Sequence, residues 1–275
     1  MTQVKIAVHQ MCSGTDPSKN ADKMALAIAA AAKAGASFYF APEMSGLLDR
    51  DRARSAQHVV SALENPVVKM AIAAARKSAI WVHIGSLPVR SERTEGRYAN
   101  RSLIIDSAGE IRARYDKIHL FDVDLSTGES WRESNAYVAG DRPVIVETPL
   151  GPMGLSICYD MRFPDLYSAY SKAKVAAIAV PAAFTVPTGR AHWHTLLRAR
   201  AIEAEAFVIA AAQAGKHEDG RETYGHSLVI DPWGTVLLDM GKGEGLGFAE
   251  IDLTRIDEVR VQIPVHLNRR DIPDP

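Results

Sequence analysis

The sequence predicts an α/β domain in which two mixed β-sheets pack face to face and helices cover their outer surfaces. Apolar segments of strand length alternate with alanine-rich or amphipathic segments of helix length, the pattern of layered α/β folds. Some neighbouring strands are joined by short turns and others by a helix, so antiparallel hairpins and parallel crossovers are both expected. The 275 residues contain no linker rich in Pro, Gly or Ser, and we expect residues 1–275 to form a single domain.

In the first half of the chain, capping residues mark the helices and apolar runs mark the strands. Pro17 follows Asp16 and begins a helix that ends at Gly35, because Pro favours the first helical position and Gly the position after the last. Strands are predicted at residues 4–8, 37–43 and 80–89, a second helix at 65–79, and a hairpin with strands at 98–106 and 111–119.

The second half begins with a long loop over residues 120–140, which has little periodicity and is rich in Ser, Asp, Glu and Gly. A loop of this length in a compact domain is often functional. The segments after it predict a hairpin at 144–158, a helix ending near 174, a strand at 175–184, a helix at 189–206, a strand at 207–213, a hairpin at 224–240 and a closing strand at 247–253.

Composition argues against several classes of function. The formal net charge is −1, whereas nucleic-acid-binding surfaces are usually basic. The longest apolar run, residues 24–32, is too short to span a bilayer, and MTQVKIAVHQ lacks the features of a secretory signal. Two cysteines do not make a disulfide framework. We therefore expect a cytoplasmic protein that binds neither nucleic acid nor membrane.

Cys158 lies at a predicted strand–turn–helix junction, in the segment GLSICYDMRFPDLY. A thiol on such a turn, near a helix that starts at Pro164, is expected to have a lowered pKa and to suit nucleophilic attack. A free Cys is also commonly a small buried hydrophobic residue. The local sequence leaves both interpretations open.

Two charged residues follow predicted strands and are candidates for the same chemistry. Glu43 ends the apolar segment FYFAPE, where desolvation should raise its proton affinity and suit a general base; a capping or ion-paired Glu is the alternative. Lys117 ends the strand IRARYDK and is placed to hold an oxyanion. Its alternative is a surface ion pair with Asp116 or Asp122.

The sequence contains no recognisable metal or nucleotide motif. His192 and His194 are two residues apart, which does not place them on one face of a helix. There is no Cys-x-x-Cys or His-Glu-x-x-His, and the glycine-rich segment 241–245 lacks the spacing of a phosphate-binding loop. We therefore expect no metal and no cofactor.

Three segments taken together resemble the nitrilase superfamily of carbon–nitrogen hydrolases: FAPEMS with Glu43, RYDKIHLFD with Lys117, and GLSICYDMRFPDLY with Cys158. Their order along the chain also matches. The resemblance extends from the first strand to about residue 255 and implies a four-layer αββα sandwich. It further implies a second glutamate between the Lys and the Cys, for which Glu133 is the first choice and Glu129 the alternative.

The resemblance assigns a role to each of these side chains. Glu43 would take the proton of Cys158, and the thiolate would attack an amide carbonyl to form a thioester that water then hydrolyses. Lys117 and the backbone N–H of Tyr159 would hold the oxyanion, and the second glutamate would position the substrate or tune the neighbouring charges.

Within the superfamily, the segments PAAFTVPTGRAHWHTLLRARAIE and VIAAAQAGKHEDGRETYGHSLVIDPWG most resemble the deaminated glutathione amidase branch, with the ω-amidases as the alternative. Both branches imply a small amide substrate that carries a carboxylate. Arg162 is a candidate to bind that carboxylate, and an ion pair with Asp160 or Asp165 is its alternative role. The other candidates for the substrate pocket are Phe184, Thr185 and Thr188, in the loop before the helix at 189.

The resemblance also implies a homo-oligomer, to which the C-terminal segment from about residue 256 would contribute contacts. Two further functional hypotheses remain open. The chain could hydrolyse another amide, a nitrile or an N-carbamoyl compound, or it could be a binding subunit of the same fold without turnover.

Overall fold

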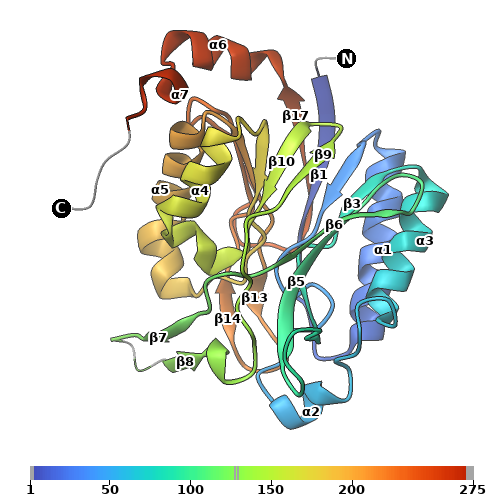
Figure 1. The fold of residues 1–275 in the computed structure, drawn as a ribbon. Helices are drawn as coiled ribbons and strands as arrows, with labels where there is room; N and C mark the ends of the chain where they lie inside the picture. Colours follow the sequence, from blue (N-terminus) through green and yellow to red (C-terminus); the bar gives the residue numbers. More distant parts are fainter. Residues whose placement is uncertain (1–2, 127, 129, 271–275) are drawn as a thin grey trace.

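A computed structural model describes residues 3–126, 128 and 130–270. Two β-sheets pack face to face, and a pair of helices covers the outer face of each (Figure 1). Helices α1 (Pro17–Lys33) and α3 (Pro66–Ser78) lie on one side, and α4 (Pro164–Lys172) and α5 (Val186–Ala204) on the other. The predicted α/β sandwich, with mixed sheets inside and helices outside, is confirmed.

The first sheet has seven strands in the order β17-β1-β2-β3-β5-β4, with β6 paired to β5. Successive residues of β1 and β2 point to opposite faces, as a pleated strand requires. Val8 and Phe40 face the second sheet, whereas Ala7 and Tyr39 face α1 and α3. The strands are β1 (Gln3–Gln10), β2 (Phe38–Phe40), β3 (Trp81–His83), β4 (Leu87–Arg90), β5 (Tyr98–Ile105), β6 (Ile111–Asp116) and β17 (Gly245–Asp252).

The second sheet has the order β16-β15-β12-β11-β10-β9. Its three central strands run parallel: β10 (Gly151–Leu155), β11 (Ala177–Ala179) and β12 (Phe207–Ala210). All residues of β11 and β12 are apolar and buried. The antiparallel flanks are β9 (Ile145–Thr148), β15 (Leu228–Ile230) and β16 (Val236–Asp239). Short pairs β7 (Asp122–Asp124) with β8 (Ser130–Arg132) and β13 (Ala214–Lys216) with β14 (Glu222–Tyr224) lie outside the sheets, as does helix α2 (Arg52–Ala56).

Helix starts agree with the capping residues found in the sequence. The carboxylate of Asp16 accepts hydrogen bonds from the N–H groups of Ser18 and Lys19, and Asn65 caps Val67 in the same way at 2.9 Å. These side chains satisfy backbone donors that have no partner inside the helix. The predictions of α1 and α3 are therefore confirmed nearly to the residue.

Several predicted elements have different boundaries in the structure. The strands at 37–43 and 207–213 are shortened to β2 and β12. The strand at 80–89 is two strands, because Gly85 adopts φ 79° and a Cβ there would fall 2.0 Å from the carbonyl oxygen of Pro42. The strand at 175–184 is only β11, since the chain after Ala179 leaves the sheet. Helix α5 begins at Val186 rather than 189, so Thr188 lies in its first turn rather than in a loop.

Two further differences concern the loop at 120–140 and the C-terminal segment. The loop contains β7, β8 and a 3₁₀ turn at Glu133–Asn135 rather than only irregular backbone. The segment after residue 253 forms α6 (Thr254–Gln262) and α7 (Val265–Asn268). The Glu205 carboxylate, at the end of α5, accepts from Val265 N at 3.0 Å and contacts His266 Nδ1 at 3.1 Å. In the part of the chain that the structure describes, no helix combines the length and apolar character needed to cross a membrane.

Candidate active site

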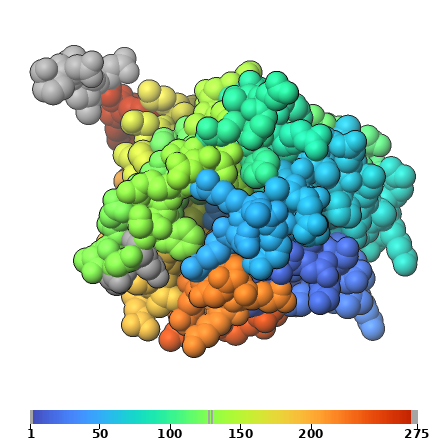
Figure 2. Space-filling view, turned by 90° about the horizontal axis from the view of Figure 1, so that it is seen from below, coloured from blue at the N-terminus to red at the C-terminus, as the bar shows by residue number. Residues whose placement is uncertain are grey.

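A cavity of about 920 Å³ opens at one end of the sandwich, where chain segments leave both sheets. Figure 2 shows the surface hollowed between the segments of α2, β7–β8 and β13–β14. Parallel strands β2, β10 and β11 all end towards this cavity, so residues that follow them in sequence meet there. The predicted residues that line it are Glu43, Lys117, Glu133, Cys158, Tyr159, Phe184, Thr185 and Thr188.

Cys158 follows β10 and has a left-handed backbone conformation, with φ 47°. This conformation is uncommon for a residue with a side chain and is often found at functional sites. The backbone N–H of Cys158 donates to Pro181 O at 2.9 Å, which ties the turn to the segment after β11. The residue is 8% exposed and borders the cavity, so the thiol lies neither on the open surface nor deep in the apolar core.

Asp160 holds the turn at Cys158 in place, a role that the sequence did not reveal. Its carboxylate is fully buried and accepts from Tyr115 Oη at 2.7 Å and from Ile157 N at 2.8 Å. It also accepts from His119 N at 2.9 Å and contacts His119 Nδ1 at 2.8 Å. Tyr115 and His119 lie two residues before and after Lys117 in sequence. Asp160 therefore connects the turn at Cys158 to the segment that carries Lys117.

Lys117 bridges the two glutamates beside the thiol. Its Nζ lies 3.0 Å from Glu43 Oε1 and 2.8 Å from Glu133 Oε2. The lysine is 3% exposed and the Glu43 side chain 5%, so these charges are removed from bulk water. Glu43 Oε2 also accepts from Ala183 N at 2.8 Å, and Glu133 Oε2 from Phe121 N at 2.7 Å. Both carboxylates are therefore fixed by backbone donors as well as by the lysine.

Asn100 completes this network and was not identified from the sequence. Its Nδ2 donates to Glu43 Oε1 at 2.9 Å and to Glu133 Oε1 at 3.1 Å. The signal was a polar residue in a predicted strand that continues into the apolar segment 103–105, where a buried amide needs partners. Lys117 N donates to Asn100 O at 3.0 Å, so strand pairing places the amide and the ammonium side by side.

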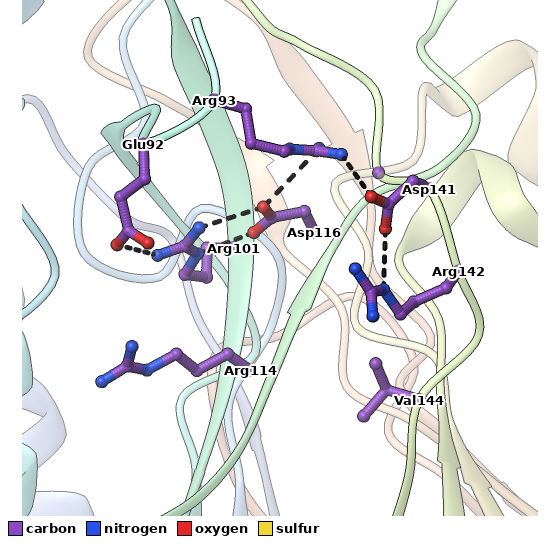
Figure 3. Close-up of a pocket in the computed structure, with 9 residues that line it drawn as sticks. Glu92, Arg93, Arg101, Arg114, Asp116, Asp141, Arg142 and Val144 are labelled. Carbon is purple, nitrogen blue, oxygen red and sulfur yellow. Dashed lines mark hydrogen bonds and ion pairs between the residues drawn. The ribbon is translucent and has the colours of Figure 1, made fainter.

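A second cavity, of about 210 Å³, adjoins these strands and is lined by arginines and acids that pair with one another (Figure 3). Arg101 pairs with Asp116 through two hydrogen bonds, of 2.7 and 3.0 Å, directly opposite each other on β5 and β6. Arg93 reaches both Asp116 and Asp141 (Figure 3). Arg101 also pairs with Glu92 at 2.8 Å, so each of these three acids is matched by an arginine. The pairing supports the positions of Asn100 and Lys117, the neighbours of Arg101 and Asp116 in sequence.

The electrostatics of the cluster differ from the expectation for Cys158. Burial raises the pKa of the thiol, the negative charge of Glu43 raises it further, and Lys117 only partly opposes this, so the pKa lies well above its usual range. The predicted lowering of the thiol pKa is therefore wrong for the resting site. The turn after Cys158 is a short 3₁₀ segment, Cys158–Arg162, and the α-helix starts only at Pro164, which removes the helix end from the sulfur.

Lys117 remains charged in this environment. Burial disfavours its ammonium form, but Glu133 and Glu43 outweigh that cost and hold the pKa of Lys117 well above its usual range. An ammonium has three N–H donors, of which the two carboxylates use two. One donor is therefore left for a group in the cavity. The backbone N–H of Tyr159 has no hydrogen-bond acceptor among the described residues, so it too is available.

The predicted substrate-binding residues are placed unequally. Phe184 and Thr185 are buried at the cavity wall, and Thr185 Oγ1 contacts Thr188 Oγ1 at 2.7 Å. Arg162 is absent from the described lining of the cavity. Its guanidinium lies over the rings of Tyr159 and Phe184, 6.0 and 5.5 Å from their centroids.

The alternative role of Arg162, an ion pair with Asp160 or Asp165, is not seen among the described residues. Arg162 Nη2 contacts His192 Nδ1 at 3.3 Å, and its guanidinium makes no ion pair with a described residue. Glu129, the alternative to Glu133, lies outside the described residues.

The structure adds cations at the cavity that the sequence analysis did not select. The guanidinium of Arg221 lies 5.1 Å from the ring centroid of Trp131, and that of Arg50 lies 5.8 Å from it. Arg221 pairs with Asp219 at 2.7 Å, whereas its side chain keeps 17% exposure at the cavity. These residues come from distant segments, so only the fold brings them together.

Comparison with known proteins agrees with this arrangement. A sequence model of the carbon–nitrogen hydrolase family matches residues 5–261. The deaminated glutathione amidase of Yersinia enterocolitica is 36% identical over 98% of this chain and 94% of its own length. The human protein of the same name is 39% identical over 96% of this chain and 82% of its own length.

Solved structures give the same answer for the fold. Saccharomyces cerevisiae Nit3, described as a member of branch 10 of the nitrilase superfamily, has a TM-score of 0.85 and 29% identity, covering 96% of this chain and 95% of that one. The Caenorhabditis elegans NitFhit protein has a TM-score of 0.89 and 38% identity, covering 98% of this chain and 66% of that longer one. The chain therefore belongs to the carbon–nitrogen hydrolase family, within the nitrilase superfamily, as its three motifs predicted.

Proposed function

We propose that this chain is a thiol amidase that hydrolyses the C–N bond of a small anionic amide through a thioester on Cys158, with deaminated glutathione as its substrate. One observation carries the proposal: Glu43, Lys117 and Glu133 converge beside the thiol of Cys158, with contacts of 2.8 and 3.0 Å between the lysine and the carboxylates. A base, a cation and a nucleophile around one cavity are the components that acyl transfer needs.

The first half-reaction follows from these contacts. Glu43 accepts the thiol proton while the sulfur of Cys158 bonds to the amide carbon, and the carbonyl electron pair moves to oxygen. The free donor of Lys117 and the N–H of Tyr159 stabilise that oxyanion. When the oxyanion collapses, the C–N bond breaks, and Glu43 gives its proton to the leaving amine. A thioester and a free amine result.

The second half-reaction uses the same base. Water attacks the thioester carbon while Glu43 takes one of its protons, and the oxyanion occupies the same donors. Collapse then releases the carboxylic acid product and the Cys158 sulfur, which recovers its proton from Glu43. In this scheme deaminated glutathione yields α-ketoglutarate and cysteinylglycine.

Two features support an anionic substrate of this kind. The relatives reported above carry the name deaminated glutathione amidase at 36 and 39% identity over nearly the whole chain. The cavity also presents Arg221 and Arg50 around Trp131, and guanidinium groups bind carboxylates in a planar, two-pronged manner. Arg162, Phe184, Thr185 and Thr188 remain our candidates to orient the substrate.

The experiment is an assay panel with matched variants. Wild-type protein should hydrolyse deaminated glutathione with a higher kcat/KM than α-ketoglutaramate or N-carbamoyl amino acids. Preference for α-ketoglutaramate would instead favour the ω-amidase alternative. Cys158→Ser should lose nearly all turnover, whereas Cys12→Ser, which changes the other free thiol, should keep it. Normal turnover by Cys158→Ser would refute the mechanism, and binding without hydrolysis by the wild type would favour a non-catalytic subunit.

Assembly and domain organisation belong to the same proposal. We expect one catalytic domain that forms a homo-oligomer, in which the segment from about residue 256 contributes contacts. Val261 and Leu267, on α6 and α7, are 81 and 67% exposed and apolar, which supports a contact there. Sedimentation velocity of wild type and of the Val261→Asp, Leu267→Asp double variant tests this, and an unchanged oligomer distribution would exclude the segment.

A further inference from the structure

Three side chains of types that can bind a metal ion, His194, His226 and Asp239, lie close together outside the lining of the large cavity. His194 of α5 lies with its Nε2 3.0 Å from Asp239 Oδ2, and His226 lies with its Nδ1 2.9 Å from Asp239 Oδ1. One ligand atom from each residue lies within 4.8 Å of the others. In the sequence, the histidine nearest to His194 is His192, which is not part of this cluster. The fold instead brings in a loop residue and the last residue of β16.

The backbone holds two of these ligands in fixed positions. His226 adopts a left-handed conformation, with φ 54°. Its N–H donates to Gly241 O at 2.6 Å, and its carbonyl accepts from Trp193 Nε1 at 2.7 Å. Asp239 Oδ1 accepts from Gly241 N at 2.9 Å. A strained conformation persists only where its surroundings impose it, and such positions are concentrated at functional sites.

Ring packing confines the imidazoles further while leaving the cluster open to solvent. The Tyr224 ring stacks on His226 at 4.5 Å and 23°. A Cβ at Gly189 would lie 2.3 Å from the Tyr224 ring, so α5 presses directly against it. The side chains of His194, His226 and Asp239 keep 36, 20 and 35% exposure, which gives an ion a path to them.

We infer that His194, His226 and Asp239 form a surface site for a divalent transition-metal ion of the zinc class. Two imidazoles and one carboxylate are ligands that zinc accepts, with water in the remaining position. Ligand atoms about 2.0–2.2 Å from a tetrahedral ion lie roughly 3.3 Å apart. The present contacts of 2.9 and 3.0 Å are close to that spacing, and the two histidine nitrogens lie within 4.8 Å of each other.

A bound ion would join α5 to the β15–β16 hairpin and to the loop after β14. This matters for the cavity because Thr188 in the first turn of α5 and Thr223 in β14 both line it. Thr185 and Thr223 also form an isolated bridge between these segments. The ion is therefore expected to stabilise the cavity wall without touching the catalytic residues.

The test uses Zn²⁺ alone, measured by titration calorimetry, and Co²⁺ as a spectroscopic probe of coordination. Free thiols compete for zinc, and Cys12 Sγ lies 3.6 Å from His217 Nδ1. The background is therefore the Cys12→Ser, Cys158→Ser double variant. In this background we expect one ion per chain and a raised midpoint of thermal unfolding.

Ligand variants decide the outcome. His194→Gln, His226→Gln and Asp239→Asn should each weaken Zn²⁺ affinity by at least about 10- to 100-fold, the range found even for outer-shell partners. His192→Gln, two residues from His194 on the same helix, is the matched control and should bind as the background does. If His226→Gln does not fold, the Zn²⁺ affinity of His194→Gln, a change at a partly exposed residue, tests the inference instead. One-to-one binding that all three variants retain, or no binding at millimolar Zn²⁺, would overturn the inference.

Discussion

Replacing Glu43, the base of the proposed mechanism, by Gln should make Cys158 more reactive towards an alkylating agent and should nearly abolish turnover. Burial, and then the charge of Glu43, holds the pKa of this thiol well above its usual range. Gln has almost the same shape and keeps an oxygen for the N–H of Ala183, but it carries no charge. The repulsion of a thiolate disappears, whereas the attraction of Lys117 remains.

Coulomb's law gives the order of magnitude of the effect for two charges in contact. A carboxylate and a thiolate about 4 Å apart repel by about 4 kcal/mol at an effective dielectric constant of 20. Removing this repulsion should lower the pKa of Cys158, so that the thiolate forms and alkylation proceeds at lower pH. Loss of the general base should at the same time reduce kcat by about 10²- to 10⁴-fold.

The assay is the rate of iodoacetamide alkylation from neutral to alkaline pH, with the labelled peptide identified by mass spectrometry. A Cys12→Ser background leaves one thiol. Glu205→Gln is the matched control, because Glu205 is equally buried but contacts α7 instead of the active site. An alkylation profile of Glu43→Gln that is unchanged, or shifted to higher pH, would contradict the proposed contact between this carboxylate and the thiol.

Three further predictions follow. Glu133→Gln should lower kcat by about 10²-fold or more, because Lys117 loses one of its two anionic partners; steady-state kinetics with KM unchanged would separate this from a binding defect. Asp160→Asn should lower the free energy of unfolding by about 1–3 kcal/mol, measured in urea, since the buried acceptor has four contacts; wild-type stability would contradict its bracing role. Burial lowers the pKa of His83 to about 3, against about 6.5 when unfolded, so on acidification the unfolded chain binds the proton first. The free energy of unfolding should therefore fall by a few kcal/mol as the pH falls from about 6.5 to about 3. His83→Gln should flatten this dependence in urea unfolding, and an equally steep profile would be evidence against it.

The sequence predicted those parts of the fold that depend on short-range signals. The helices α1 and α3 begin directly after Asp16 and Asn65, whose side chains cap the adjacent backbone, and these signals involve only three or four residues. The break between β3 and β4 depends instead on how Gly85 packs against the carbonyl of Pro42, some forty positions away. Local periodicity gives no information about contacts between residues so far apart in the sequence.

The same distinction applies to the active site. Glu43, Lys117 and Cys158 were found because each lies in a recognisable motif, and the structure places them around one cavity. Asn100 lies in no such motif, and only strand pairing shows that its amide contacts both glutamates. The raised pKa of the thiol was missed for a related reason, since it depends on burial and on a charge more than a hundred residues away.

The distribution of charge explains why the cluster contains two glutamates and one lysine. With a neutral thiol the cluster carries one net negative charge, and transfer of the thiol proton to Glu43 leaves that net charge unchanged. The reaction therefore moves a charge from oxygen to sulfur and then to the oxyanion, without creating a new one in a buried site. At the moment when Glu43 is neutral, Lys117 has lost one partner and would itself become a better acid. Glu133, at 2.8 Å, keeps the ammonium charged at that moment, so the second glutamate preserves the donor that the oxyanion requires.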